Sequence, residues 1–506
     1  MQLSVVNNAK RNMIFGFINK FVALICPFIA RTAIQMILGS EYLGLSSLFT
    51  AILNVLSLSE LGISGAIVYN MYKPVANNDK ETVCALLNFY RKVYKIIGFV
   101  ILVIGLCLIP FLPYLISGSY PSDTNIVILY LIYLSNTVIS YFMFAYMSSL
   151  IVVYQRDDIN SRTNTIVTLL MYGIQIAILF TTENYYLYLL IMPIFTIVNN
   201  LRVAFIVRKM FPEYKPKGKI SKDVSADIKV RVSGAFITNV SMVTRNSLDS
   251  VCISMFLGLT LTAIYNNYYY IIAGLISILG IVSTSLQGGV GNHVAIRSVE
   301  ENFTELKKVD FAYMWGSSWC TVCLICLYQP FMYLWMGESM MLDIPAVALL
   351  CFYFYILKMS DMRSIYSTTN GLWWHHRYRS MAEAAGNIVL NIVLGKFFGV
   401  YGIISATIIT IFLLNFLWGT QITFKHYFGY KFVPQYLLYH FKYLTITACL
   451  CIVTYLCCSI LPIQNKVVIL LVRGVICIII PNVIWIFLFH NTKEFSYMRS
   501  VILKRR

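Results

Sequence analysis

Residues 27–39 read PFIARTAIQMILG and belong to an apolar run that extends from about residue 13 to residue 38. A helix needs about 20 apolar residues to cross a bilayer, so this run predicts a transmembrane helix. Arg31 nevertheless stands inside it. A charge at the centre of a spanning helix costs about 2.5–3.5 kcal/mol on insertion scales, and such residues usually face a protein interior or a cavity. The stretch therefore predicts a membrane fold and a functional cation.

The composition of the whole chain agrees with a membrane protein. Of its 506 residues, 59% are hydrophobic and 12% are charged, whereas soluble domains carry about 25% charged residues. The net charge of +18 does not require nucleic acid as a partner, because Lys and Arg accumulate in the cytoplasmic loops of membrane proteins. We therefore expect membrane lipids, and no nucleic acid, around this chain.

Apolar runs separated by polar breaks predict an all-α integral membrane protein with about fourteen transmembrane helices. The helices are expected at about 13–38, 43–71, 93–117, 125–153, 163–181, 185–208, 231–257, 262–291, 311–335, 344–370, 379–396, 401–423, 438–460 and 467–490. Basic residues gather in alternate loops and in the C-terminal tail. The positive-inside rule then places both termini in the cytoplasm.

The longest polar segment divides the chain. Residues 209–230 are basic and rich in Lys, with Pro and Gly, which is typical of a linker. It separates an N-terminal lobe of six helices (1–208) from a C-terminal lobe of six helices (231–423). Residues 424–506 then contain two further helices and a basic cytoplasmic tail.

An internal repeat supports the two lobes. A shift of 219 residues, from 17 to 236, aligns FINK (17–20) with FITN (236–239) and MILG (36–39) with MFLG (255–258). Both copies enter the membrane from the same side, so they predict parallel repeats. This architecture occurs in transporters whose binding site lies between the halves.

The cations inside the predicted spans are candidate substrate-binding residues. They are Lys20 and Arg31 in the first helix, Arg245 in the seventh and Arg363 in the tenth. Two have alternatives: Lys20 can extend its ammonium group to the headgroups, and Arg245 can pair with Asp249 one turn further on. A surplus of arginine favours an anionic substrate, especially phosphate or pyrophosphate, which guanidinium binds in a bidentate manner.

Three carboxylates in the spans are candidates for gating or for coupling to an ion gradient: Glu60, Asp249 and Glu383. Glu383 shares a helix face with Asn387 and Asn391, so hydrogen bonds between helices are the alternative role. Nothing in the sequence identifies the coupling ion, which can be Na⁺ or H⁺.

No motif indicates a cofactor or catalysis. The chain lacks GxxxxGK[ST] and GxSxG, and its six histidines are scattered. Cys320, Cys323 and Cys326 have CxxC spacing, but a closed zinc site needs four ligands, so we interpret them as small buried residues and expect no metal. Asp157 and Asp158 are interpreted as a solvated turn. The alternative of another class is a membrane glycosyltransferase or polymerase that uses Asp157 or Glu383.

Three segments carry a family resemblance. EYLGLSSLFTAILNVLSLSELGISGAIVYNMYKPVANND (41–79) resembles the second-helix region of polysaccharide repeat-unit flippases in the MOP superfamily, and residues 246–275 and 371–408 are similar to other parts of these proteins. The resemblance implies a V-shaped, MATE-like bundle of two six-helix lobes plus two C-terminal helices. It also implies a place in the bacterial cytoplasmic (inner) membrane.

The same resemblance implies a function. In such flippases a polyprenyl-pyrophosphate-linked oligosaccharide, such as an undecaprenyl-linked O-antigen or capsule repeat unit, crosses the membrane by alternating access. Its head group occupies a central cationic cavity lined by arginines, which Arg31 and Arg245 match by region. The polymerase of the same glycan pathway is an implied partner. A lipid II flippase and a MATE-type multidrug antiporter share the fold and are the alternatives. The antiporter would be favoured by an unpaired carboxylate in the first helix, which carries Lys20 and Arg31 instead.

Overall fold

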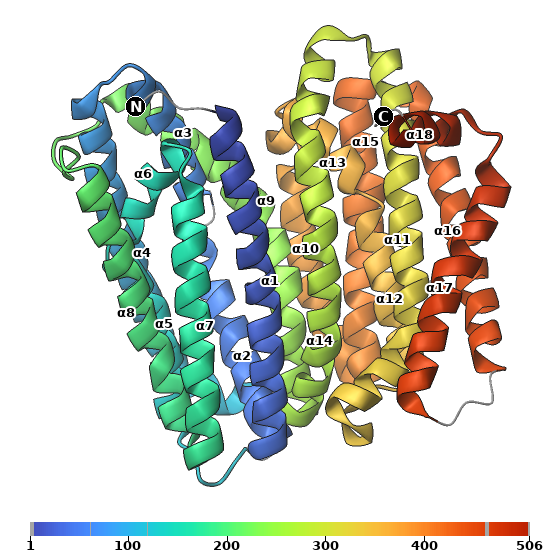
Figure 1. The fold of residues 1–506 in the computed structure, drawn as a ribbon, viewed down its shortest axis with the longest axis horizontal. Helices are drawn as coiled ribbons and strands as arrows, with labels where there is room; N and C mark the ends of the chain where they lie inside the picture. Colours follow the sequence, from blue (N-terminus) through green and yellow to red (C-terminus); the bar gives the residue numbers. More distant parts are fainter. Residues whose placement is uncertain (1–4, 61, 119, 461–464, 504–506) are drawn as a thin grey trace. The chain divides into compact units, whose positions relative to one another are not determined.

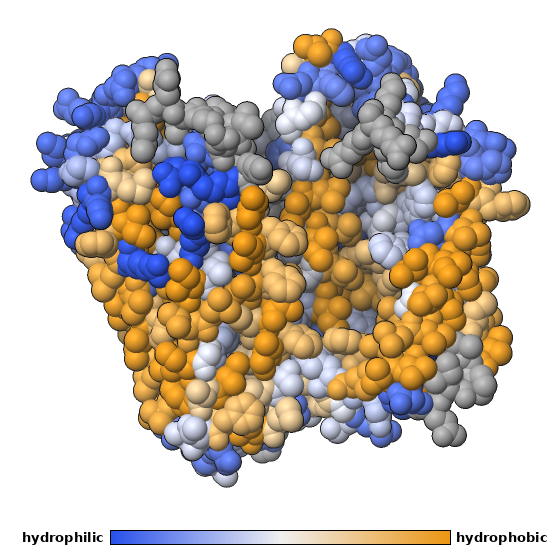
Figure 2. Space-filling model, in the orientation of Figure 1, coloured by the Kyte–Doolittle hydropathy of each residue, from blue (hydrophilic) through white to orange (hydrophobic). Residues whose placement is uncertain are grey.

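The computed structural model describes residues 5–60, 62–118, 120–460 and 465–503, and these residues form helices and loops without any strand. Ten of the described helices are long and apolar enough to cross a membrane, or eleven if a bent pair counts as one span. In Figure 2 apolar side chains cover the middle of the long helices, and hydrophilic ones gather mostly near their ends. The predicted fold class, an all-α multi-pass membrane protein, is confirmed.

The predicted count of fourteen spans agrees with these helices when broken and polar ones are included. The 52-residue segment Arg377–Phe428 contains two spans, because Gly399 adopts φ 57° and ψ −136° and interrupts α14. The pair α2 and α3 replaces one predicted span, with the turn η1 between them. The seventh span is α9, whose polar residues keep it below the hydropathy of the others.

The helices are assigned as follows. They are α1 (Val5–Ile37), α2 (Ser40–Leu56), α3 (Ile63–Ala76), α4 (Lys80–Leu108), α5 (Ile126–Phe142), α6 (Ser148–Val153), α7 (Asp157–Thr182), α8 (Tyr185–Met210), α9 (Lys222–Leu257), α10 (Leu259–Ile296), α11 (Val299–Met336), α12 (Ile344–Lys358), α13 (Asp361–Thr369), α14 (Arg377–Thr410), α15 (Gly419–Thr423), α16 (Val433–Ser459), α17 (Lys466–Phe489) and α18 (Lys493–Leu503). Short 3₁₀ turns are η1 (Ser57–Glu60), η2 (Ile109–Leu115), η3 (Ala145–Met147), η4 (Glu338–Met340), η5 (Leu372–Trp374) and η8 (Tyr430–Phe432), and the π-helical segments are η6 (Ile411–Trp418) and η7 (Phe424–Phe428).

The chain forms two compact units, Met1–Ala263 and Ile264–Arg506. In the first unit α1 packs against α7, α7 against α8, and α5 against both α8 and α4 (Figure 1). Helix α9 also belongs to this unit, because it packs on α2 and α3 and Asn70 donates a 3.0 Å hydrogen bond to Asp227. The lobe boundaries expected at the linker 209–230 stay a prediction.

The second unit is organised around α11. This helix contacts α12, α16, α17 and α18, while α12 packs against α14, and α16 against α17 (Figure 1). The two helices that follow the predicted C-terminal lobe therefore pack on the long α11 and are part of the unit.

The sequence repeat has a structural counterpart in its two glycines. MILG (36–39) and MFLG (255–258) each end a long helix, α1 or α9. Gly39 adopts φ 98° and ψ −178°, and Gly258 adopts φ 88° and ψ 176°. Both values of φ lie in the region that favours glycine. The two copies therefore turn from one helix to the next with the same backbone geometry.

Candidate functional site

Arg31 lies in the interior of the first unit. It is half-buried on α1, and its charge acts on the hydroxyls of Tyr133 on α5 and Tyr188 on α8. Both tyrosines are buried, and Tyr133 donates a 2.8 Å hydrogen bond to Ser46. The structure thus places the guanidinium among phenol groups from two other helices. Lys20, eleven residues earlier on α1, is exposed and lies about 16 Å along the helix from Arg31.

Glu60 is bound by two tyrosines. It ends the 3₁₀ turn η1 between α2 and α3. The hydroxyl of Tyr94 donates to one carboxylate oxygen at 2.6 Å, and that of Tyr141 donates to the other at 2.5 Å. Tyr90 in turn donates to the hydroxyl of Tyr94 at 2.9 Å. A carboxylate held by phenols from α4 and α5 is an ionisable group in the interior of the unit.

Arg245 and Asp249 are both buried on α9, with 8% and 4% of their surface exposed. They stand one turn apart, as the sequence predicted, and α9 packs on α2. The structure therefore keeps a guanidinium and a carboxylate side by side on one helix of the first unit, which holds Arg31 as well.

Arg363 lies in a buried charge network of the second unit, which consists of Arg363, Asn415, Glu383 and Arg379. Arg363 is 2% exposed, and its Nη2 donates to the carbonyl oxygen of Asn415 at 3.0 Å and to its side-chain oxygen at 3.4 Å. The amide of Asn415 donates to Glu383 at 3.4 Å, and Glu383 forms a 2.7 Å ion pair with Arg379. The network contains two cations and one carboxylate.

The position of the Arg363 guanidinium requires glycine at residue 419. A Cβ atom at Gly419 would lie 2.4 Å from Nη1 of Arg363, so only glycine leaves room for the guanidinium there. Nε and Nη1 of Arg363 are buried and have no hydrogen-bond partner among the described residues. Buried donors without acceptors are costly, so this guanidinium retains capacity for an anion.

Two other ionic contacts have both partners within the protein. Lys358 lies 2.8 Å from Asp361, and Tyr313 donates to the same carboxylate. Asp158 is fully buried and pairs with Arg11 at 3.0 Å and with Arg156 at 3.1 Å. The interpretation of Asp157 and Asp158 as a solvated turn is therefore wrong for Asp158, which joins the start of α7 to α1.

His376, in the loop directly before α14, is a neutral histidine close to the buried network. Burial, together with the charges of Arg363 and Arg379, lowers the pKa of His376 from 6.5 to about 3. Its Nε2 lies 3.3 Å from the hydroxyls of Ser367 and Thr423. His376 is thus uncharged at neutral pH and adds no positive charge to the region.

The predicted site residues fall into two groups. Lys20, Arg31, Glu60, Arg245 and Asp249 belong to the first unit, and Arg363 and Glu383 share one network in the second. Sequence reasoning missed the tyrosines around Arg31 and Glu60 and did not identify Arg379 as a buried cation. The i, i+4 spacing of Arg379 and Glu383 was the signal that identifies their pair.

A buried pair between α11 and α16 was also not predicted from the sequence. His440 Nε2 lies 2.7 Å from Asp310, with neither side chain exposed, and Tyr439 donates to Asp310 at 2.9 Å. His440 and Asp310 are 130 positions apart in the sequence, so no residue spacing predicts their contact. Only the packing of the helices reveals it.

Comparison with solved structures places the fold among known transporters. The lipid II flippase MurJ, in an inward closed conformation, is similar with a TM-score of 0.62 and 16% identity over 97% of this chain and 100% of that one. An inward-facing multidrug resistance MATE family transporter of the MOP superfamily is similar with a TM-score of 0.59 and 16% identity, over 78% of this chain and 94% of that one. A MOP superfamily transporter from Pyrococcus furiosus is similar with a TM-score of 0.52 and 14% identity, over 82% of this chain and 95% of that one.

No family model and no curated protein sequence matches the chain. The likeness is therefore one of fold, and the chain shares the fold of these MOP-type transporters. The expected MATE-like architecture is confirmed.

Proposed function

We propose that the protein is a flippase that moves a polyprenyl-pyrophosphate-linked oligosaccharide, such as an O-antigen or capsule repeat unit, across the bacterial inner membrane. It works by alternating access, with both termini in the cytoplasm, and performs no chemistry on the substrate. Arg31 and Arg245 bind the pyrophosphate or acidic sugars, assisted by Arg363 and Lys20. Binding energy that differs between inward and outward states shifts the chain from one to the other.

The observation that carries this proposal is the buried guanidinium of Arg363, which stands in a network with more cations than carboxylates. The helix α1 contains no carboxylate and places Arg31 among buried phenols. The network around Arg363 holds two guanidinium groups for one carboxylate, and two donors of Arg363 lack partners among the described residues. Charges inside a membrane protein are stable when paired. We infer that the substrate supplies the acceptor for the two donors of Arg363 that lack partners among the described residues, and pyrophosphate matches guanidinium well.

Two further observations favour a flippase over an antiporter of the same fold. The flippase structure covers 97% of this chain, whereas the inward-facing MATE structure covers 78%. The tyrosines near Arg31 are rigid side chains that combine an apolar face with a hydroxyl. Their hydroxyls add polar groups beside the arginine, which suits a substrate with an anionic and a hydroxylated part.

We assign coupling to the carboxylates in the same proposal. Glu60 is the foremost candidate, because both of its carboxylate oxygens accept hydrogen bonds from phenol hydroxyls. Glu383 has Arg379 of the same helix as its counter-ion and accepts a hydrogen bond from Asn415 on η6, so it acts as a gate that joins α14 to η6. Asp249 is the third candidate, beside Arg245.

The test is replacement of the native gene by variants with Arg31→Ala or Arg245→Ala, followed by assay of surface glycan and of lipid-linked precursor. Both variants should lose most surface glycan and accumulate precursor. Arg202→Ala is the matched control, because Arg202 is an exposed arginine on α8 of the same unit, and it should export normally. Normal glycan export by both test variants, at normal protein level, would refute the cationic site.

Lipid II transport is the second candidate, favoured by full coverage of the flippase structure. Both substrates carry a prenyl pyrophosphate, so the arginines serve either. Loss of the protein distinguishes the two: arrest of cell-wall synthesis indicates lipid II, and loss of a surface polysaccharide in cells that continue to grow indicates the repeat unit.

A further inference from the structure

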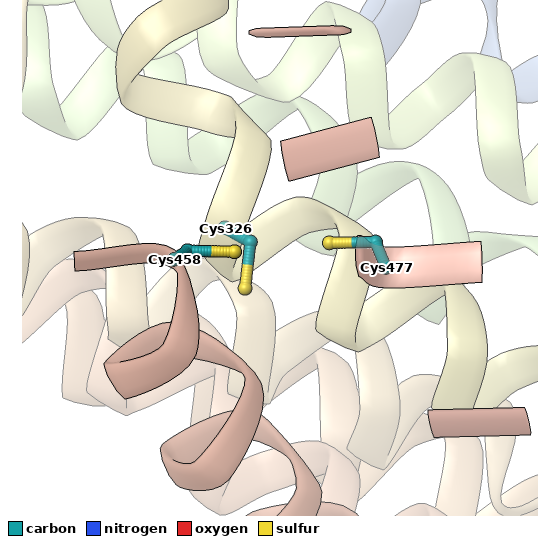
Figure 3. Close-up of side chains that lie close together, drawn as sticks. All are labelled: Cys326, Cys458 and Cys477. Atoms are coloured by element: carbon teal, nitrogen blue, oxygen red, sulfur yellow. The ribbon is translucent and has the colours of Figure 1, made fainter. Parts of the chain in front are cut away.

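Three cysteines from three helices meet inside the second unit. Cys326 on α11, Cys458 on α16 and Cys477 on α17 have sulfur atoms that all lie within 4.8 Å of one another. Their side chains are at most 1% exposed, and all three are free thiols. Figure 3 shows the side chains of Cys458 and Cys477 directed toward Cys326. We propose that this cluster binds a thiophilic divalent metal ion, Zn²⁺ by preference, through three thiolates.

The group differs from the one that the sequence spacing singled out. Of the CxxC cysteines only Cys326 belongs to it, while its partners come from 132 and 151 positions further along the chain. Cys323 contacts Cys477 and is the nearest source of a fourth sulfur. The expectation that Cys320, Cys323 and Cys326 are merely small buried residues rested on the lack of further ligands nearby in sequence, which the packing of α16 and α17 supplies.

The distances fit a shared ion. A zinc–thiolate bond is about 2.3 Å long, so three sulfurs in a plane around one ion lie about 4.0 Å apart. The observed upper limit of 4.8 Å requires shifts of well under 1 Å, which side-chain rotations provide. A disulfide would bring two sulfurs to about 2.0 Å and leave the third thiol without a role.

The charges fit as well. Arg473 stands one turn before Cys477 on α17, and its Nη1 donates to the carbonyl oxygen of Cys326 at 3.2 Å. Its Nε is buried without a hydrogen-bond partner among the described residues. Three thiolates and one divalent ion carry a net charge of −1, which the guanidinium neutralises. A neutral assembly is the arrangement that an apolar interior favours.

Binding replaces three thiol protons by one metal ion and needs no oxidant. Soft thiolate ligands select Zn²⁺ and Cu⁺ over hard cations. An ion here ties α16 and α17 to α11, so it stabilises the folded protein in proportion to its binding. This proposal does not depend on the transport function.

The first test is titration of the full-length protein, purified in detergent and reduced, with Zn²⁺ and with Cd²⁺ as a spectroscopic probe. One ion per chain should bind, with thiolate-to-Cd²⁺ charge-transfer absorption in the ultraviolet. Cys326→Ser, Cys458→Ser and Cys477→Ser should each weaken binding at least tenfold, and Arg473→Gln should weaken it too. Cys351→Ser is the matched control, a buried thiol on α12 of the same unit, and should bind as the native protein does.

A second test needs no substitution and so does not depend on variants that fold. Zn²⁺ should slow the alkylation of Cys326, Cys458 and Cys477, measured by mass spectrometry, and leave the exposed Cys449 on α16 unaffected. The proposal is overturned by lack of saturable binding, by unchanged affinity in the three serine variants, or by binding of Cu⁺ without Zn²⁺. A disulfide between two of the three cysteines in protein isolated without reductant would also overturn it, in favour of a redox pair.

Discussion

Replacing Glu383 by glutamine should destabilise the second unit far more than the loss of one hydrogen bond. Glu383 is 1% exposed and pairs with Arg379 at 2.7 Å, and the same network contains Arg363. The substitution keeps the size of the side chain but leaves two guanidinium groups in the network without its carboxylate. A single hydrogen bond contributes about 0.5–1.5 kcal/mol, whereas breaking a buried ion pair by removing one partner costs about 3–5 kcal/mol.

Thermal unfolding of the purified protein in detergent measures this difference. For a unit of about this size, 1 kcal/mol shifts Tm by about 2–4 °C, so Glu383→Gln should lower Tm by about 6–20 °C. The double variant with Arg379→Gln and Glu383→Gln should recover at least half of that loss, because two amides can bond to each other and no charge is left unpaired between them. A drop of less than about 2 °C in the single variant, or a double variant as unstable as the sum of the singles, would refute the reasoning.

Three further predictions concern separate features. Gly44→Ala should lower Tm or expression, because its Cβ would lie 2.2 Å from the carbonyl oxygen of Leu259, whereas Gly173→Ala, where nothing lies within 4 Å, should not; equal stability of both would contradict the close approach. The depressed pKa of His376, about 3 against 6.5 in the unfolded chain, means that its contribution to stability is complete above pH 6.5 and is lost as the pH falls toward 3. His376→Gln should therefore flatten the acid limb of the Tm–pH curve, and an unchanged limb would count against it. Glu60→Gln should remove ion-coupled transport while the protein still reaches the membrane; full transport activity would exclude Glu60 as the coupling site.

Much of the fold can be predicted from the sequence, because neighbouring residues alone determine where an apolar helix forms and where a glycine allows a turn. A run longer than 20 apolar residues forms a helix in a bilayer wherever it stands, so a helix is present at each predicted span. Several helices begin earlier than predicted, such as α4 at Lys80 and α11 at Val299, because polar residues extend them beyond the apolar run. The repeat also survives, since Gly39 and Gly258 share one backbone conformation that side chains with a Cβ rarely adopt. Helices that break or carry many polar residues, such as α9 and the pair α2 and α3, were found through the same runs.

The candidate sites could be predicted only in part, because their contacts join distant segments. The intramembrane cost of a charge identifies Arg31 and Arg363 as exceptional, but it does not show that Arg363 contacts Asn415 or that Arg31 lies near Tyr133. Nor does it show that Arg379, at the edge of a predicted span, is buried and paired with Glu383. The cysteines of α11, α16 and α17 meet for the same reason, through packing that no spacing encodes.

The most direct test of the central claim is reconstitution of the purified protein into liposomes that contain a polyprenyl-pyrophosphate-linked oligosaccharide. The fraction of glycan accessible to an external lectin or glycosidase measures how fast the substrate crosses the bilayer. The native protein should equilibrate the substrate between leaflets, and Arg31→Ala should slow this at least tenfold while Arg202→Ala does not. No flipping by a folded, reconstituted native protein, or equal rates in the native protein and Arg31→Ala, would contradict the account.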